Sequence, residues 1–218
     1  MQVFLYEYLT GGGMWQQSGK PPGGSLLAEG RAMIQAVAAD FAALPKMEVV
    51  TIRDSRLAAL HPATCRVTIV VSEDEEREAL RRLANSADWT LLIAPETGGA
   101  LLERCRAVED AGGRILSAPS ALIEIVANKQ TTVDLLSRCR VPVPRGVLLT
   151  PGERELPRNI EFPIVVKPVD GCGSQGVRLF TAKRNQEPFS GVGDSDRDSA
   201  SKNDSRTALL RVEEFIPG

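Results

Sequence analysis

The segment Val165–Val177, which reads Val-Val-Lys-Pro-Val-Asp-Gly-Cys-Gly-Ser-Gln-Gly-Val, decides the fold. Ile164–Val169 has the apolar composition of a buried strand, and side-chain alternation places Lys167 on the face of Val165 and Val169. An ammonium on an apolar face is costly unless an anion meets it, and phosphate is a natural partner. The alternative is an edge strand, which Pro168 would suit, with the lysine reaching into solvent.

A glycine-rich loop, Asp170–Gly176, follows this strand. Gly171 and Gly173 alternate with other residues, and Ser174 adds a hydroxyl before Gln175. Glycine has no Cβ and tolerates positive φ, so successive amides can converge on an anion. The loop lacks the Gly-Lys-Ser/Thr ending of a Walker A motif and leads into a predicted strand rather than a helix. A phosphate-binding loop and a plain hairpin turn are therefore both open.

The rest of the chain alternates strand-length apolar runs with segments of helical period, which predicts an α/β fold. We expect two domains, 1–118 with a doubly wound parallel sheet and 119–218 as a second module opening near Val141–Pro144. The predicted strands are 2–8, 49–52, 66–71, 89–94, 114–117, 146–149, 164–169, 177–181 and 209–215. The predicted helices are 25–44 with Ser25 as N-cap, 73–85, 99–111, and one or two helices in 121–138 after Pro119.

Composition favours small-molecule chemistry. The formal net charge is −2, from 26 basic and 28 acidic residues in short mixed clusters, so no broad basic face is offered to nucleic acid or to a membrane surface. No run is long enough to span a bilayer, and the first residues do not resemble a signal peptide, which predicts a cytoplasmic protein. Four widely spaced cysteines and the single His61 make a zinc site improbable and favour reduced thiols.

Residues 184–206 have almost nothing to bury. Serine, aspartate, glycine and asparagine dominate the segment, so we expect a flexible surface insertion. A phosphorylation or docking loop is the alternative.

Four motifs in order along the chain resemble the ATP-grasp superfamily of ligases. They are Asn128-Lys129 before the proline-rich Val141–Pro144, then Lys167-Pro168, then the glycine loop ending in Gly176-Val177, and finally Val212–Gly218. Asn128 stands where the family usually has aspartate. The resemblance implies a Rossmann-like pre-ATP-grasp domain followed by a partial ATP-grasp lobe of α+β type.

The resemblance also implies an ATP site. Lys129 and Lys167 would clamp the phosphates while the glycine loop, with Gly171, Gly173, Ser174, Gln175, Gly176 and Val177, closes over them. Glu213 would meet the exocyclic amine of adenine, and the backbone of Glu214 and Ile216, flanking Phe215, would bind its edge. For Glu213-Glu214 alone, a solvated acidic pair is the alternative.

The first domain offers candidate substrate contacts. Gly11-Gly12-Gly13 follows the first strand, where such a sheet binds ligands, and Glu96 lies at the end of another strand. Three consecutive glycines do not form the GxGxxG fingerprint, so a dinucleotide site is a weak alternative. An exposed loop carboxylate is the alternative for Glu96. The segment Glu7–Gly13 loosely resembles the opening of tyramine–glutamate ligases of methanofuran synthesis and their bacterial relatives.

The sequence given ends at Gly218, directly after the last motif. ATP-grasp ligases bind Mg²⁺ through acidic and Asn residues of a later lobe, so we expect the metal ligands outside this chain. The first functional hypothesis is an ATP-dependent carboxylate–amine ligase, possible as a homodimer, that works through an acyl phosphate. The second is a non-catalytic nucleotide-binding or regulatory module.

Overall fold

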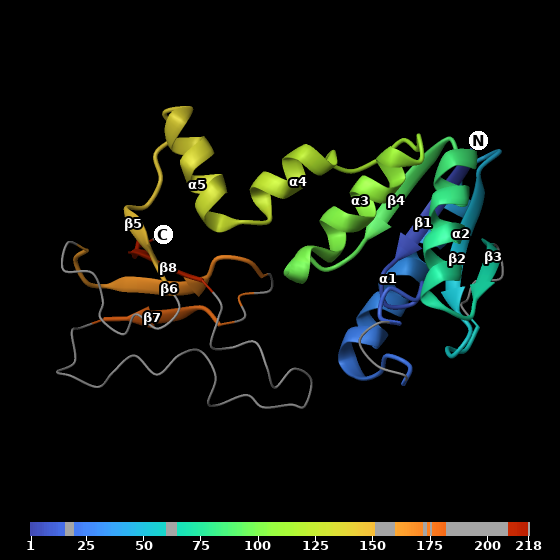
Figure 1. The fold of residues 1–218 in the computed structure, drawn as a ribbon, viewed down its shortest axis with the longest axis horizontal. Helices are drawn as coiled ribbons and strands as arrows, with labels where there is room; N and C mark the ends of the chain where they lie inside the picture. The colour runs from blue at the N-terminus through green and yellow to red at the C-terminus, as the bar shows by residue number, and fades with distance from the viewer. Residues whose placement is uncertain are drawn as a thin grey trace. The chain divides into compact units, whose positions relative to one another are not determined.

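The computed structural model describes residues 1–15, 20–59, 65–150, 160–171, 174, 176–181 and 209–217. The chain divides into two compact units, Met1–Ile123 and Glu124–Gly218, where the sequence analysis placed the division after residue 118 (Figure 1). Each unit has its own sheet. The chain is therefore of the α/β class, as predicted.

The first unit is built on a parallel sheet in the order β3-β2-β1-β4. Its strands are β1 (Gln2–Glu7), β2 (Glu48–Asp54), β3 (Cys65–Val70) and β4 (Trp89–Ile93). The predicted strand 114–117 is wrong, because only an isolated bridge joins Ile115 to Thr90. Pro119, two residues beyond, has no N–H with which to extend a ladder.

Helices cover both faces of this sheet. The helices are α1 (Gly24–Ala42), α2 (Glu73–Ser86) and α3 (Ala100–Asp110), the last preceded by the 3₁₀ turn η1 (Thr97–Gly99). Ile34 and Ala38 of α1 pack on Leu5 and Val49, whereas α2 and α3 pack on the opposite face around Phe4. The sheet is thus the middle of three layers.

The predicted N-cap of α1 is wrong. The helix begins at Gly24, its N-cap is Gly23, and no side chain caps it, so Ser25 lies inside the first turn. Gly23 and Gly24 adopt the turn into the helix, with Gly24 at φ 73°, a conformation that costs glycine little.

The second unit places an antiparallel sheet beside a helical segment. After α4 (Ser120–Val126) and α5 (Lys129–Arg138) come β5 (Gly146–Leu149), β6 (Ile164–Pro168), β7 (Arg178–Phe180) and β8 (Leu210–Glu214). The strand order is β5-β8-β6-β7. Strand β6, which carries Lys167, is therefore an inner strand, and the edge-strand interpretation is wrong. Pro168 ends the strand beyond the stretch that pairs with β7.

The two faces of this sheet differ. One face forms the core of the second unit through Ile164, Val166 and Val212, together with Leu149 and Ile160. The register pairs Val166 with Val212 and Lys167 with Arg211, so the alternate positions Val165, Lys167, Arg211 and Glu213 share the other face. That second face carries the charged residues.

Several predictions fall on residues outside those that the structure describes, namely His61, Cys172, Gly173, Gln175 and the insertion 184–206. Among the described residues, no helix is both long and apolar enough to cross a membrane. The same part of the chain contains no group of three or more His, Cys, Asp or Glu side chains arranged to hold a metal ion.

Candidate functional site: a charged sheet face in the second unit

Asn128 starts the helix that carries Lys129. Its side-chain oxygen accepts hydrogen bonds from the amides of Gln130 at 2.9 Å and Thr131 at 3.1 Å, so it is the N-cap of α5. Segment 121–138 is consequently two helices that meet at this cap. Asparagine is as good an N-cap as aspartate, so the departure from the family pattern preserves the local structure while removing a negative charge.

Lys129 is fixed to the end of β6 by two bonds. Its amide donates to the carbonyl of Val169 at 2.9 Å, and its ammonium donates to the carbonyl of Gly171 at 2.8 Å. The first amides of α5 are thus already used by Val169 and by Asn128. A phosphate at this place would have to be bound by the lysine side chain rather than by the helix N-terminus.

Lys167 meets a carboxylate on the neighbouring strand. Its ammonium forms a short ion pair with Oε1 of Glu213, while Nε of Arg211 donates to Oε2 of the same carboxylate at 2.9 Å. Glu213 and Arg211 are almost completely buried, whereas the Lys167 side chain is 23% exposed. The anion demanded by a lysine on this strand is therefore present in the protein itself.

The charges on this face do not balance. Lys167 and Arg211 are two cations and Glu213 is one carboxylate, which leaves a net charge of +1 on this face. Lys129 adds a further positive charge at the carbonyl of Gly171, just beyond β6. Within the described residues, no carboxylate lies within ion-pair distance of the Lys129 ammonium. Like charges directly opposite each other across strands are unfavourable, and Lys167 faces Arg211 in the register. The face is therefore suited to an anionic ligand.

The two glutamates at the end of β8 have different environments. Glu213 points to the Lys167 face, but the Glu214 carboxylate accepts hydrogen bonds from the amide of Arg145 at 3.0 Å and from its Nε at 3.2 Å. The bond from the Arg145 amide is the main reason that the pKa of Glu214 lies below its ordinary value. A solvated acidic pair is thus wrong for Glu213.

The backbone beyond β8 is partly used. The amide of Glu214 donates to Arg145 and that of Phe215 donates to Pro163, at 2.9 and 3.0 Å. The Phe215 and Ile216 side chains are both exposed. Any edge contact to a ligand from this segment would therefore come from carbonyl oxygens or from the amide of Ile216.

The glycine loop connects two antiparallel strands, β6 and β7. Of its described residues, Gly171, Ser174 and Gly176 all have positive φ, at 110°, 58° and 71°. The amide of Val177 donates to the carbonyl of Ser174 at 3.2 Å. The loop is a hairpin connection in topology, and its left-handed positions explain the need for glycine at two of them.

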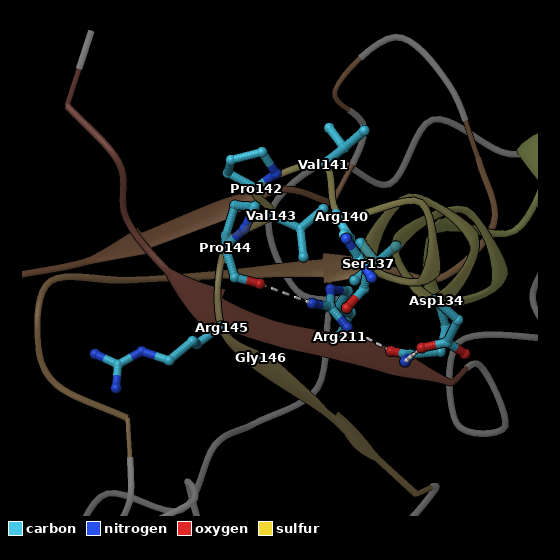
Figure 2. A pocket seen from close by; sticks show the side chains of 12 residues that line it. Asp134, Ser137, Arg140, Val141, Pro142, Val143, Pro144, Arg145, Gly146 and Arg211 are labelled. Carbon is cyan, nitrogen blue, oxygen red and sulfur yellow. Dashed lines mark hydrogen bonds between the residues drawn. The ribbon is translucent and has the colours of Figure 1, made fainter.

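A cavity of about 540 Å³ lies beside this charged face. It is lined by one side of α5, the proline-rich segment 140–145, Gly146 and Arg211. Figure 2 shows the Arg211 guanidinium reaching toward the carbonyl of Pro144 on one side and toward the start of α5 on the other, while Arg145 points away.

Two glycines of the first unit, Gly11 and Gly13, use their amides for hydrogen bonds within the protein. The amides of Gly11 and Gly13 donate to the carbonyls of Glu7 and Tyr8 at 2.7 and 2.8 Å. A Cβ at Gly11 would lie 2.8 Å from the Tyr6 ring, and one at Gly13 would lie 2.3 Å from the Tyr8 ring. Close packing by itself therefore accounts for glycine at both positions.

Glu96 lies in the loop after β4, as predicted, and it is exposed, which agrees with the alternative of an exposed loop carboxylate. Gly98 and Gly99 follow it, with φ values of 63° and 72° and no atom near the position that a Cβ would take. The loop is therefore open around Glu96.

A buried polar network in the first unit has no signal in the sequence. The hydroxyl of Tyr6 donates to Glu76 at 2.6 Å, and Arg104 donates to that hydroxyl and to Glu76, both at 3.2 Å. Burial raises the pKa of Tyr6 well above its ordinary value, and burial also raises the pKa of Glu76, against the opposing charge of Arg104. The network joins β1 to α2 and α3.

A second missed cluster lies at the carboxyl end of β2. The buried carboxylate of Asp54 accepts hydrogen bonds from the amide of Arg56 at 2.8 Å and from its NH2 group at 2.6 Å, and the Arg56 guanidinium stacks 3.6 Å above the Trp15 ring. Asp54 and Arg56 are only two residues apart, but their pairing and the contact of Arg56 with the distant Trp15 leave no periodic pattern by which the cluster could be found.

Two family models match adjacent parts of the chain. A pre-ATP-grasp domain model matches residues 47–123, and an ATP-grasp domain model matches residues 126–193. Among curated proteins, the carbamoyl phosphate synthase large chain of Archaeoglobus fulgidus is 28% identical over 94 residues, which are 42% of this chain and 9% of that protein.

Solved structures share the fold over the whole chain. A putative ATP-grasp superfamily protein from Archaeoglobus fulgidus has a TM-score of 0.61 at 20% identity, covering 100% of this chain and 54% of that one. D-alanine–D-alanine ligase from Bacillus anthracis has a TM-score of 0.56 at 17% identity, with coverage of 100% and 57%. The biotin carboxylase domain of Hydrogenobacter thermophilus 2-oxoglutarate carboxylase has a TM-score of 0.58 at 16% identity, with coverage of 99% and 44%.

This chain spans about half the length of these solved structures. The order of the two family models matches the order of the two units, a parallel sheet first and an antiparallel sheet second. The chain belongs to the ATP-grasp superfamily, with a pre-ATP-grasp domain followed by sequence of the ATP-grasp domain.

Proposed function

We propose that this chain is the ATP-binding part of an ATP-dependent carboxylate–amine ligase. The observation that carries the proposal is the charged face of the β6–β8 pair, where Lys167, Arg211 and Glu213 meet, with the Lys129 ammonium at the carbonyl of Gly171 just beyond β6. The net positive charge of these groups stabilises a polyanion such as a nucleotide phosphate.

The contacts of the two lysines suggest how phosphate would bind. The Lys129 ammonium donates to a carbonyl, which is a weaker acceptor than an anion. Exchanging that carbonyl for a phosphate oxygen should therefore cost little free energy. Lys167 would exchange the Glu213 carboxylate for phosphate. Because both partners are anions, that exchange replaces one charge-assisted bond with another.

The adenine would lie near Glu213 and the residues after it. A carboxylate accepts from an exocyclic amine, and Oε1 of Glu213 would lose its present partner when Lys167 turns to a phosphate. We propose Glu214, Phe215 and Ile216 as the backbone strip along the base. Gly171, Gly173, Ser174, Gln175, Gly176 and Val177 would cover the phosphates.

The reaction class is proposed from solved structures of similar fold, whose names describe ligation and carboxylation. D-alanine–D-alanine ligase joins two amino acids, and a biotin carboxylase domain has been solved with MgADP and bicarbonate. In this class, phosphoryl transfer turns a carboxylate into an acyl phosphate, which an amine then attacks. We propose a small-molecule carboxylate and amine as substrates, and Mg²⁺ as the ion that accompanies the nucleotide.

We also propose contacts to the acceptor substrate in the first unit. Gly11, Gly12, Gly13 and Glu96 are candidates for contacts to the acceptor substrate, with the amides of Gly11 and Gly13 already engaged. We also propose a cytoplasmic protein able to form a homodimer. The loose resemblance to tyramine–glutamate ligases suggests an acidic amino acid as one substrate.

Isothermal titration calorimetry with MgADP tests the binding step. We expect saturable binding to the chain, reduced at least tenfold by Lys167→Met, because one of the phosphate partners is lost. Lys46→Met, which removes an exposed lysine of the first unit, is the matched control and should bind like the unaltered chain. Equal affinity in all three proteins would refute the proposal.

Catalysis requires a separate measurement, in which ATP is offered together with candidate carboxylates and amines. Release of ADP that depends on a carboxylate and an amine supports the ligase. Nucleotide binding without such release would instead favour a non-catalytic nucleotide-binding or regulatory module.

A further inference from the structure

Arg211 is among the most deeply buried charged groups in the described chain, at 1% exposure. Its Nε donates to Oε2 of Glu213 at 2.9 Å, and one terminal nitrogen donates to the side-chain oxygen of Gln130. The other terminal nitrogen donates to the carbonyl of Pro144 at 3.2 Å (Figure 2). One guanidinium therefore ties β8 to α5 and to the segment before β5.

The neighbouring strand leaves space for this guanidinium. A Cβ at Gly146 would lie 2.8 Å from a terminal nitrogen of Arg211 and 2.6 Å from the carbonyl of Val212. No side chain other than hydrogen fits there without moving the arginine or the backbone. Gly146 is therefore explained by close approach, since its φ is not in the left-handed region.

Glu213 has two cationic partners of different accessibility. Lys167 is 23% exposed and has Glu213 as its partner, whereas Arg211 is buried and held by three acceptors. Under the proposed function, Lys167 leaves Glu213 for a phosphate. Without Arg211, the Glu213 carboxylate would then be a buried charge with no partner, which is strongly unfavourable.

We propose that Arg211 is a positioning residue that holds the Glu213 carboxylate for the nucleotide base while Lys167 is engaged with phosphate. This inference rests on the proposed function and adds to it a fixed counter-ion. Through Gln130, the residue after Lys129, the same guanidinium also sets the position of the first turn of α5 relative to β8. The base-reading and phosphate-binding parts of the site are thereby joined by one side chain.

The test compares ADP with GDP, because guanine has a carbonyl oxygen where adenine has its exocyclic amine. The unaltered chain should prefer ADP, and Arg211→Met should weaken ADP binding about tenfold while changing GDP binding little. Lys167→Met should weaken both nucleotides equally. A purely structural role for Arg211 would also weaken the binding of both nucleotides. Loss of the preference for ADP over GDP therefore distinguishes the positioning role from a purely structural one.

A double-substitution cycle asks whether Arg211 acts through Glu213. In a Glu213→Gln background, Arg211→Met should cost ADP binding less than about twofold, because the carboxylate that it positions is gone. Independent, multiplying losses would overturn the inference.

A milder variant covers the case in which Arg211→Met does not fold. Gln130→Met removes one acceptor of the guanidinium without changing charge, and it should lower the ADP-to-GDP selectivity by about threefold. Unchanged selectivity would overturn the inference. If the unaltered chain binds both nucleotides equally, the inference fails while phosphate binding stands; if it binds neither, the proposed function fails.

Discussion

Replacing Arg104 with methionine should strongly destabilise the first unit. Arg104 is the cation of the buried network, donating to Glu76 and to the Tyr6 hydroxyl at 3.2 Å each. Glu76 is completely buried and Arg104 is nearly so. Methionine fills similar space but, among the residues that the structure describes, leaves the Glu76 carboxylate with only the Tyr6 hydroxyl as a hydrogen-bond partner.

The expected magnitude follows from the burial of the pair. Removing one partner of a buried ion pair costs about 3–5 kcal/mol of unfolding free energy, because an uncompensated charge remains. With an m-value of about 2 kcal/mol/M for a unit of this size, the urea midpoint should fall by about 2 M. Since domains are typically stable by about 5–15 kcal/mol, this loss is a large fraction of the stability of the unit.

The loss should depend on pH. Burial already raises the pKa of Glu76 above its ordinary value of 4.5, and Arg104 opposes that rise. Without Arg104 the pKa of folded Glu76 rises further, so the folded variant holds a proton that the unfolded chain releases. Stability is then fullest below pH 4.5 and is lost as the pH rises through the folded pKa. The deficit should therefore be small near roughly pH 5 and large near roughly pH 8.

Tryptophan fluorescence during urea unfolding isolates this unit, because Trp15 and Trp89 are the two tryptophans of the chain and both lie within residues 1–123. Arg82→Met on the exposed side of α2 is the matched control and should change stability by less than about 0.5 kcal/mol. The double variant Glu76→Gln with Arg104→Met should regain about 2 kcal/mol. A loss below about 1 kcal/mol, independent of pH, would refute the reasoning.

Three further predictions concern caps, backbone strain and a thiol. Asn128→Ala should remove the N-cap of α5, costing about 1 kcal/mol, and should speed hydrogen exchange of the Gln130 and Thr131 amides about fivefold. Arg140→Gly should stabilise the end of α5 by about 1 kcal/mol, because Arg140 has φ 62° just beyond the helix; mass-spectrometric hydrogen exchange over the last turn measures it. Burial raises the pKa of Cys105 to about 11, so iodoacetamide should label the exposed Cys139 at neutral pH and spare Cys105 until the protein is unfolded; peptide mapping distinguishes them. Asn128→Asp, which keeps the cap, should leave exchange unchanged, and Arg138→Gly, inside the helix, should destabilise where Arg140→Gly stabilises. Fast exchange in Asn128→Asp, destabilisation by Arg140→Gly, or equal labelling of the two thiols in the folded protein would each contradict the corresponding argument.

Local patterns predicted most of the helices and strands. Strand β5 has the predicted bounds, and the other confirmed strands differ at their ends, because alternation and apolar runs depend on near neighbours in the chain. The strand predicted at 114–117 is wrong because a short apolar run has the composition of a strand whether or not it forms a continuous ladder, and here it forms only an isolated bridge. The prediction of Ser25 as the N-cap is wrong because the neighbouring glycines form the turn into α1 without a side-chain cap.

The sequence predicted some of the residues of the charged face but not all of them. Lys129, Lys167 and Glu213 belong to motifs with recognisable neighbours, so they could be named as candidates. Arg211 could not, because its strand reads Leu-Arg-Val-Glu-Glu and an arginine there is equally consistent with an exposed position. Its 1% exposure and its bonds to Gln130 and Pro144 arise from segments 67 or more residues away.

The sequence alone determined the order of the elements and the family, and it made Lys129 and Lys167 the candidate phosphate-binding residues. Periodicity and motifs depend on residues that are close together along the chain, so both can be recognised without the tertiary structure. Tertiary structure decided which charges meet. It paired Lys167 with Glu213, gave that carboxylate a second, buried partner in Arg211, and turned Glu214 toward Arg145. These contacts depend on strand order and register, which bring distant residues within a few ångströms. The segment Val165–Val177 indicates an anion site, and the sheet shows that a carboxylate of the protein already lies beside its lysine.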